Sequence, residues 1–236
     1  MIISQVLETS PTVSPAQPSP PAALTGVVTP NTAIATPTRA PANGGGPSAS
    51  LTGFAFPVAG GCLPKGDQLM PNAPRSYRNG IHEGVDFYDS DSCTGITRGT
   101  QVLAAKAGTV IRADLDYKDI TSADVARYQA NPNSEAALDV FRGRQVWIDH
   151  GLDASGVRIV TRYCHLSAVA QGISVGTQVA RGQVIAAVGE SGTPESVTRP
   201  GSEYHLHFEI RTGDSFLGKA LPPAQVRALY VAAFAQ

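Results

Sequence analysis

The stretch Gly176-Thr-Gln-Val-Ala-Arg-Gly-Gln-Val-Ile-Ala-Ala-Val188 repeats a pattern found earlier in the chain, in Gly99-Thr-Gln-Val-Leu-Ala-Ala-Lys-Ala-Gly-Thr-Val-Ile111. Both stretches open with Gly-Thr-Gln-Val and carry a second glycine before a Val-Ile pair. Short runs rich in β-branched residues, separated by glycine, are typical of two strands joined by a turn. We therefore predict two related strand-turn-strand units, as an old internal duplication would leave.

Short strand-like segments also occur outside these two units. Val, Ile and aromatic residues dominate residues 54–58, 145–149, 158–163 and 205–210. Long helical periodicity is almost absent from this part of the chain. Many short strands joined by glycine turns indicate an all-β fold, built as a sandwich or a barrel.

Residues 114–143 interrupt this pattern and predict a helical insertion. Ser122 and Ser134 are placed as helix N-caps, Pro132 separates the two segments, and Gly143 suits a helix end. A further helix is predicted at residues 222–236, which are rich in alanine. This C-terminal helix is expected to pack on the outside of the sheet, with Val226, Leu229 and Tyr230 at helical spacing.

Composition divides the 236 residues into two parts. Residues 1–50 consist almost wholly of Pro, Ser, Thr, Ala and Gly, and such a segment buries too little apolar surface to offset its ordering entropy. We predict a disordered tether there and one domain over residues 51–236, with its core in residues 56–211. Because tethers of this kind are common outside the cytoplasm, an extracytoplasmic location is expected, although residues 1–10 do not have the features of a signal peptide.

The charge and hydropathy of the chain argue against several partners. A formal net charge of -1 provides no basic patch for nucleic acid or for an anionic membrane surface. No stretch approaches the ~18 to 20 apolar residues of a membrane span. The chain is expected to be a monomer.

Three cysteines are present, and two of them flank the first histidine motif. Cys62 and Cys93 are predicted to form a disulfide across that motif, because an extracytoplasmic location is an oxidising compartment. The alternative is that all three are reduced and buried. Cys164 has no partner in either case and is expected to fill the core, because strand alternation turns it away from Tyr163 and His165.

Two short motifs place histidines and acids where they can meet. In His205-Leu-His-Phe-Glu-Ile210, His205, His207 and Glu209 project from one face of a strand and the residues between them project into the core. The second motif is His82-Glu-Gly-Val-Asp86. In a fully extended strand its first and last α-carbons would be about 13 Å apart, so a bend is predicted at Gly84, because glycine accepts unusual backbone angles.

Two histidines and one aspartate bound to a metal leave a fourth tetrahedral position open, which is typical of a catalytic zinc site. Zinc lowers the pKa of bound water to about 7 and polarises a carbonyl, so peptide hydrolysis follows from such a site. That reaction also needs a base and an oxyanion donor. His165 and His205 are free to serve in these roles.

The motifs His82-Glu-Gly-Val-Asp86, Tyr163-Cys-His-Leu166, Gly182-Gln-Val-Ile185 and His205-Leu-His-Phe-Glu209 resemble, in this order, those of the lysostaphin-like peptidoglycan endopeptidases. The resemblance covers roughly residues 56–211. It implies an antiparallel barrel-sandwich hybrid and cleavage of peptide bonds in bacterial peptidoglycan. It also implies zinc bound by His82, Asp86 and His207, with His165 and His205 flanking the catalytic water. The chain departs from the family pattern in two places, the insertion at residues 114–143 and a longer loop at residues 193–203. Both are expected to affect the shape of the substrate-binding groove and the choice of substrate.

Other functions are compatible with parts of this pattern. A catalytically inactive binding or activator module of the same fold normally lacks metal ligands, and none is missing here. A non-heme iron oxygenase also uses two histidines and a carboxylate, but it predicts a further ligand histidine after His207, and none exists. A biotinyl-type carrier would need a modifiable lysine at a hairpin tip, which we do not find.

Several single residues have an ordinary structural explanation. His150 is expected to be a hydrogen-bonded core or surface histidine and not a ligand. Glu83 is expected to point away from the metal. Glu209 is expected either to bond a ligand histidine from behind or to be a solvated charge. Tyr77 is expected to be a packing residue, with donation to the oxyanion as the alternative.

Overall fold

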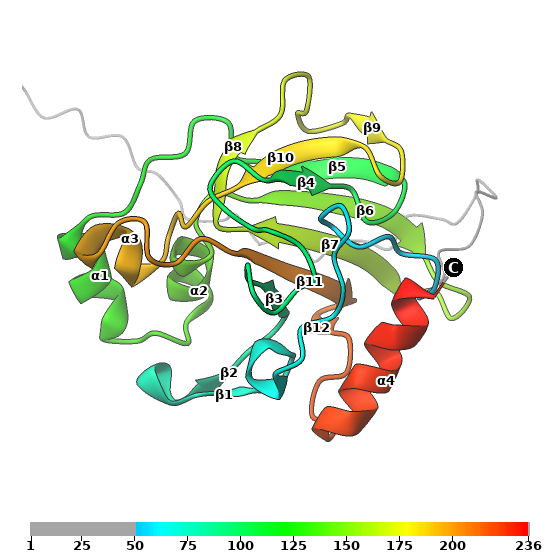
Figure 1. Cartoon of the computed structure of the whole chain (residues 1–236), viewed down its shortest axis with the longest axis horizontal. Coiled ribbons are helices and arrows are strands. Elements are labelled where there is room, and N and C mark those ends of the chain that lie inside the picture. The colour runs from blue at the N-terminus through cyan, green and yellow to red at the C-terminus, as the bar shows by residue number, and fades with distance from the viewer. Residues whose placement is uncertain (1–50, 236) are drawn as a thin grey trace, which may run out of the picture. The chain divides into compact units, whose positions relative to one another are not determined.

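The computed structural model describes residues 51–235, so the tether expected for residues 1–50 lies outside the described residues, and the division into tether and domain stays a prediction. The described chain contains three antiparallel sheets of seven, three and two strands. Figure 1 shows α1, α2 and α3 gathered on one side of the sheets and α4 on the opposite side. The predicted all-β class, with a helical insertion and a C-terminal helix, is confirmed.

The largest sheet has the strand order β12-β11-β7-β6-β5-β9, and β3 pairs with β11 as well. Its two ends do not meet, so the sheet is open and is not closed into a barrel. Its strands are β3 (Val85–Phe87), β5 (Gly108–Ala113), β6 (Val146–Leu152), β7 (Arg158–Cys164), β9 (Gln178–Val179), β11 (Leu206–Thr212) and β12 (Ser215–Phe216).

Two smaller sheets complete the described strands. The three-stranded sheet has the order β4-β10-β8, with β4 (Gln101–Leu103), β8 (Leu166–Val169) and β10 (Val184–Val188). A short hairpin consists of β1 (Pro74–Arg75) and β2 (Gly80–Ile81), with the 3-10 turns η1 (Asp67–Leu69) and η2 (Ser76–Arg78) before and within it.

The two repeated units pair with each other. The first strand of each unit lies against the second strand of the other, since β4 pairs with β10 and β9 pairs with β5. Their Gly-Thr starts build the same turn: Gly99 and Gly176 have φ of 92° and 91°. Thr100 and Thr177 each accept a hydrogen bond at Oγ1 from a backbone N–H three residues earlier, at 3.0 Å. Left-handed φ values of this kind favour glycine, which explains the repeated motif.

Alternate side chains of β11 point into the hydrophobic core. Leu206, Phe208 and Ile210 are fully buried, as predicted from the period of two. The Phe208 ring lies 5.3 Å from the ring of Tyr163 and 6.1 Å from that of Phe234 on α4, measured between centroids. These aromatic contacts fix one face of β11 and so leave its other face to the polar side chains.

The insertion contains the two predicted helices, α1 (Ser122–Gln129) and α2 (Glu135–Phe141). Ser134 caps α2 and Gly143 follows it with φ of 67°, as expected. The cap of α1 is Thr121 and not Ser122, because Thr121 and Asp124 form a reciprocal capping box. A third helix, α3 (Pro194–Thr198), was not predicted; it lies against α1, and its cap is formed by Thr193.

The C-terminal helix α4 (Pro223–Phe234) buries Val226 and Tyr230, whereas Leu229 is about one-third exposed at 36%. Phe234 stacks on Phe56 with ring centroids 4.3 Å apart. The strand predicted for residues 54–58 is not formed. This segment makes isolated backbone hydrogen bonds to residues 103 and 105, and Pro57 has no N–H to continue a ladder.

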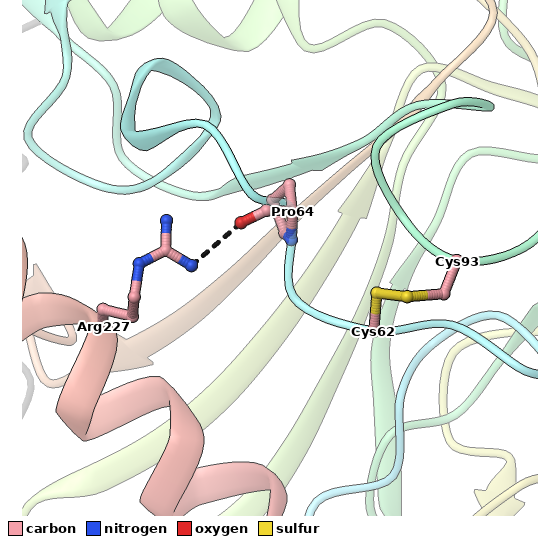
Figure 2. Close-up of a disulfide and its surroundings, with 4 residues drawn as sticks. All are labelled: Cys62, Pro64, Cys93 and Arg227. Carbon is pink, nitrogen blue, oxygen red and sulfur yellow. Dashed lines mark hydrogen bonds between the residues drawn. A yellow bond between two sulfur atoms is a disulfide. The ribbon is translucent and has the colours of Figure 1, made fainter.

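Cys62 and Cys93 form the predicted disulfide, with α-carbons 5.5 Å apart (Figure 2). Beside it, Arg227 of α4 donates a hydrogen bond to the carbonyl oxygen of Pro64 at 2.9 Å. Cys164 is free and fully buried, as expected. No helix within residues 51–235 has the length and apolar character needed to cross a membrane.

Candidate metal site and cleft

His82, Asp86 and His207 converge although their motifs lie more than 120 residues apart. Strand β3 pairs with β11 so that Asp86 lies opposite His207. Asp86 Oδ1 is 3.0 Å from His82 Nε2 and 2.8 Å from His207 Nδ1, and these two nitrogens are 3.0 Å apart. Three ligands at tetrahedral zinc lie about 3.3 Å from one another, so the three atoms approach the spacing that one ion requires.

Gly84 bends the chain between His82 and Asp86, as predicted, but for a different reason. Its φ is not in the left-handed region. A Cβ at this position would lie 2.5 Å from the carbonyl oxygen of Phe208 and 2.9 Å from the ring of His207. Glycine is therefore needed because β11 passes too close for any side chain.

Hydrogen bonds behind the two histidines direct their lone pairs inward. His82 Nδ1 lies 3.1 Å from the carbonyl oxygen of Met70, and His207 Nε2 lies 3.1 Å from Glu209 Oε1. If these outer nitrogens carry the protons, the three inner atoms are all acceptors and repel one another. A divalent cation relieves that repulsion, and a ligand histidine that donates its other N–H to a carbonyl or carboxylate is the usual arrangement. The residues therefore fit a metal such as zinc.

The charges at the site support the same conclusion. Burial alone would raise the pKa of Asp86, but His82 and His207 hold it well below its usual range. Arg75 also donates a hydrogen bond to Asp86 Oδ2 at 3.0 Å, which leaves Asp86 Oδ1 facing His82 and His207. Burial lowers the pKa of His207, yet hydrogen bonds to Asp86 and Glu209 raise it to about 9. A site that attracts an extra proton this strongly also attracts a cation.

His165 and His205 lie beside this group, and each is anchored by one nitrogen. His165 Nδ1 contacts the carbonyl oxygen of Ser191 at 2.9 Å, and His205 Nδ1 contacts that of Glu203 at 2.7 Å. Their ring centroids are 4.6 Å apart, and His205 Nε2 is 3.9 Å from Asp86 Oδ1. Burial, with the nearby His205 and His207, lowers the pKa of His165 well below its usual value, which keeps this ring neutral.

Tyr88 supports His205 and was not identified from the sequence. Its ring stacks on the imidazole of His205 at 4.4 Å, and its hydroxyl donates to Glu203 Oε2 at 2.8 Å. The only available signal was its position two residues after Asp86, which by strand alternation places it on the same face.

Behind His207 lies a cluster of two acids and three arginines. Glu209 is fully buried, so the solvated alternative for this residue is wrong and the hydrogen bond to His207 is formed. Burial would raise the pKa of Glu209, but Arg142 and the other neighbouring charges hold it well below its usual range. Glu83 accepts hydrogen bonds from Arg142 and Arg211, both at 2.7 Å, and so faces the arginines.

The arginines of this cluster were also missed. Arg211 could have been found, because it continues the alternation of His207 and Glu209 on β11. Arg142 gave no sequence signal, since it lies 67 residues from Glu209.

Cys164, His207 and Glu209 form a second close group, with ligand atoms within 4.8 Å. This group is a poor metal site. Burial raises the pKa of the Cys164 thiol well above its usual value, so the thiol stays protonated. The carboxylate of Glu209 is already engaged by arginines.

A cleft of about 640 Å³ opens over the convergent group. The β1–β2 hairpin forms one side, and the insertion and α3 form the other. Tyr77 lines the cleft and is 78% exposed, so its expected packing role is wrong. The two sides are linked, because Arg78 Nη1 donates to Asn133 Oδ1 at 2.8 Å and Asn133 Nδ2 donates to the Arg78 carbonyl at 2.6 Å.

His150 is not part of the site. Its Nδ1 lies 2.9 Å from the carbonyl oxygen of Ala107, and its Nε2 lies 2.9 Å from Thr161 Oγ1. Both ring nitrogens therefore have partners within the protein, which confirms the expectation for this histidine.

Comparison with known proteins identifies a family whose sequence model matches the chain. The sequence model of Peptidase family M23 matches residues 80–219, a span that holds all four quoted motifs. No curated protein matches the chain.

Three solved structures that resemble the chain illustrate the range of its structural neighbours. A zinc-containing peptidase from Vibrio cholerae is 21% identical, with 72% of this chain and 41% of that chain covered and a TM-score of 0.43. The catalytic domain of lysostaphin from Staphylococcus simulans is 22% identical, with 65% and 85% covered and a TM-score of 0.38. A catalytic-domain mutant of the prophage-encoded M23 protein EnpA from Enterococcus faecalis is 19% identical, with 67% and 92% covered and a TM-score of 0.37. The chain spans less than half of the Vibrio protein.

Proposed function

The chain belongs to peptidase family M23, whose model matches more than half of the sequence, and on that premise we propose that it is a zinc-dependent endopeptidase that hydrolyses peptide bonds of bacterial peptidoglycan. The family expected from the motifs is thereby confirmed. The convergence of His82 Nε2, Asp86 Oδ1 and His207 Nδ1 supports the activity most directly, because three inward lone pairs at 2.8 to 3.0 Å suit one metal ion.

In this proposal His82, Asp86 and His207 hold the zinc. Bound zinc would supply an acidified water and a Lewis acid for the scissile carbonyl. Met70 and Glu209 keep the two imidazoles in the tautomers that present lone pairs to the metal, and Arg75 orients Asp86 by binding its other oxygen.

His165 and His205 are the proposed proton carriers. Because each donates from Nδ1 to a backbone carbonyl, each presents Nε2 toward the cleft with a lone pair in the neutral ring. One Nε2 can take the proton of the attacking water, and a protonated Nε2 can then deliver it to the leaving amine or stabilise the oxyanion.

The proposed substrate is the stem or cross-bridge peptide of the wall, which requires an extracytoplasmic protein. The disulfide between Cys62 and Cys93 supports that location, because such bonds persist in oxidising compartments. The cleft has polar residues near the histidines and the insertion on one side, so the insertion is proposed to select among peptides.

The test is incubation of the purified chain with peptidoglycan sacculi that differ in cross-bridge type. We expect new free amino groups and shorter peptides, identified by mass, from at least one wall type. A chelator should abolish the release and added zinc should restore it, with about one zinc per chain by metal analysis.

Two results would contradict the proposal in different ways. Loaded zinc without cleavage of any wall type would indicate an inactive binding module of the same fold. Purification with iron in place of zinc would instead favour the non-heme iron alternative.

A further inference from the structure

The two oxygens of Glu209 have different partners. Oε1 accepts hydrogen bonds from His207 Nε2 at 3.1 Å and from Arg142 Nε at 2.8 Å. Oε2 contacts Arg211 at 3.1 Å and Arg162 at 3.4 Å. Within the described residues, Arg142 is thus the arginine that shares the oxygen holding the ligand histidine.

Arg142 reaches the other histidines as well. Its Nη2 binds Glu83 Oε2 at 2.7 Å, and Glu83 directly follows His82 in the chain. Its carbonyl oxygen accepts the backbone N–H of His165 at 2.9 Å. With a side chain only 9% exposed, Arg142 connects three segments, which carry His82, His165 and the pair His205 and His207.

The end of the insertion has little freedom to move. Arg142 is the residue that ends α2, and Gly143 packs so closely on the Ser191 turn that a Cβ would lie 2.0 Å from the Ser191 carbonyl oxygen. That same oxygen anchors His165 Nδ1. The backbone of Arg142 is therefore held between α2 and the Ser191 turn, and the bonds to Glu209 and Glu83 hold its guanidinium.

We propose that Arg142 is a positioning residue of the metal site, which holds Glu209 behind His207 and Glu83 beside His82 and so couples the helical insertion to the ligands. The inference rests on the proposed zinc site. A planar guanidinium suits this role because it offers several donors in a fixed fork, whereas a lysine ammonium acts as a single flexible point charge. Residues that form hydrogen bonds to a metal ligand, on the side away from the metal, commonly affect the metal affinity.

The experiment measures zinc affinity by competition with a chromophoric chelator, in full-length wild type, Arg142→Met, Arg142→Lys and Arg211→Met. Arg211 is the matched control, because it contacts the same two acids but the other oxygen of Glu209. We expect Arg142→Met to weaken zinc binding by roughly 10- to 100-fold, Arg142→Lys to weaken it less, and Arg211→Met to have the smallest effect. The absorption spectrum of the cobalt-substituted protein should change in Arg142→Met, because the ligand histidine is free to shift.

Equal zinc affinity in wild type and Arg142→Met would overturn the inference, as would an equal loss in Arg211→Met, which would indicate charge neutralisation alone. Circular dichroism shows whether Arg142→Met is folded. If it is not, Arg142→Lys decides, and wild-type affinity in that variant would also overturn the inference. A wild-type chain that binds no zinc would refute the proposed function instead, and the two failures are therefore distinguishable.

Discussion

The floor and the wall of the cleft are held in different ways. The floor consists of His82, Asp86, His165, His205 and His207, and the wall consists of Tyr77, Gln129, Pro132, Leu138 and Phe141 from the hairpin and the insertion. Each floor histidine has its outer nitrogen fixed to a carbonyl or carboxylate, and the floor residues are buried, apart from His165, which is half-buried. The wall residues are exposed or half-buried, and the hairpin and the insertion that carry them are linked by hydrogen bonds between Arg78 and Asn133. The floor is built for fixed geometry, and we expect the wall to vary without loss of the chemistry.

The largest effect is expected from His207→Ala. Removing one of the three proposed zinc ligands should lower zinc affinity by more than the roughly 10- to 100-fold that is typical when a hydrogen-bond partner of a ligand is lost, so the variant should purify with almost no zinc and no activity. Metal analysis checks this. His150→Ala is the matched control, since His150 lies outside the floor and should leave zinc content unchanged.

A smaller effect separates the two kinds of floor histidine. His205→Ala and His165→Ala should keep zinc but lower turnover by about 10² to 10⁴, because they remove the proposed proton-transfer or oxyanion groups and leave the proposed ligand set intact. The readouts are zinc content and kcat on sacculi. Zinc lost from His205→Ala while His207→Ala stayed loaded would reverse the ligand assignment.

The wall is tested by Asn133→Ala, which removes both hydrogen bonds of the link to Arg78. We expect the relative cleavage rates of different wall types to change several-fold, on the scale of about 1 kcal/mol per lost hydrogen bond, with unchanged zinc content. Asn131→Ala is the control in the same exposed loop. An unchanged ranking of substrates would mean that the link does not shape selectivity.

The smallest effect on catalysis is expected from Cys93→Ser. Opening a loop with a sequence separation of 31 should lower the free energy of unfolding by roughly 3 to 4 kcal/mol in the chain-entropy model. Denaturant titration measures this loss, while zinc content and kcat at low temperature should change little. A large fall in kcat without a fall in stability would show that the floor depends on the disulfide directly.

The features that follow from short-range patterns could be predicted. Strand alternation placed His205, His207 and Glu209 on one face of β11, and the spacing of His82 and Asp86 predicted the bend at Gly84. The disulfide was predicted from two cysteines that flank the same motif and from the expected oxidising compartment. Contacts between distant segments could not be predicted in this way. The cluster around Arg142 and the stacking of Tyr88 on His205 depend on how the insertion and β3 meet β11, which no local period encodes.

Errors at segment ends have local causes. Thr121 competes with Ser122 for the cap of α1, and the reciprocal bonds with Asp124 decide in favour of Thr121. Residues 54–58 have the composition of a strand, but Pro57 removes a donor. The helix α3 has only five residues, and its Thr-Pro start is a signal too short to separate from a loop.

The disulfide also changes what a protease can do to this molecule. Residues 62–93 form a covalent ring, and the exposed Tyr77 lies inside it on the hairpin that borders the cleft. A single backbone cut at this exposed site cannot release the N-terminal piece, because Cys62 and Cys93 still join the two fragments. The carbonyl oxygen of Met70 would therefore stay close enough to accept the hydrogen bond from His82 Nδ1. A nicked chain should therefore run as one band without reductant and as two bands with it, and should still hold its metal.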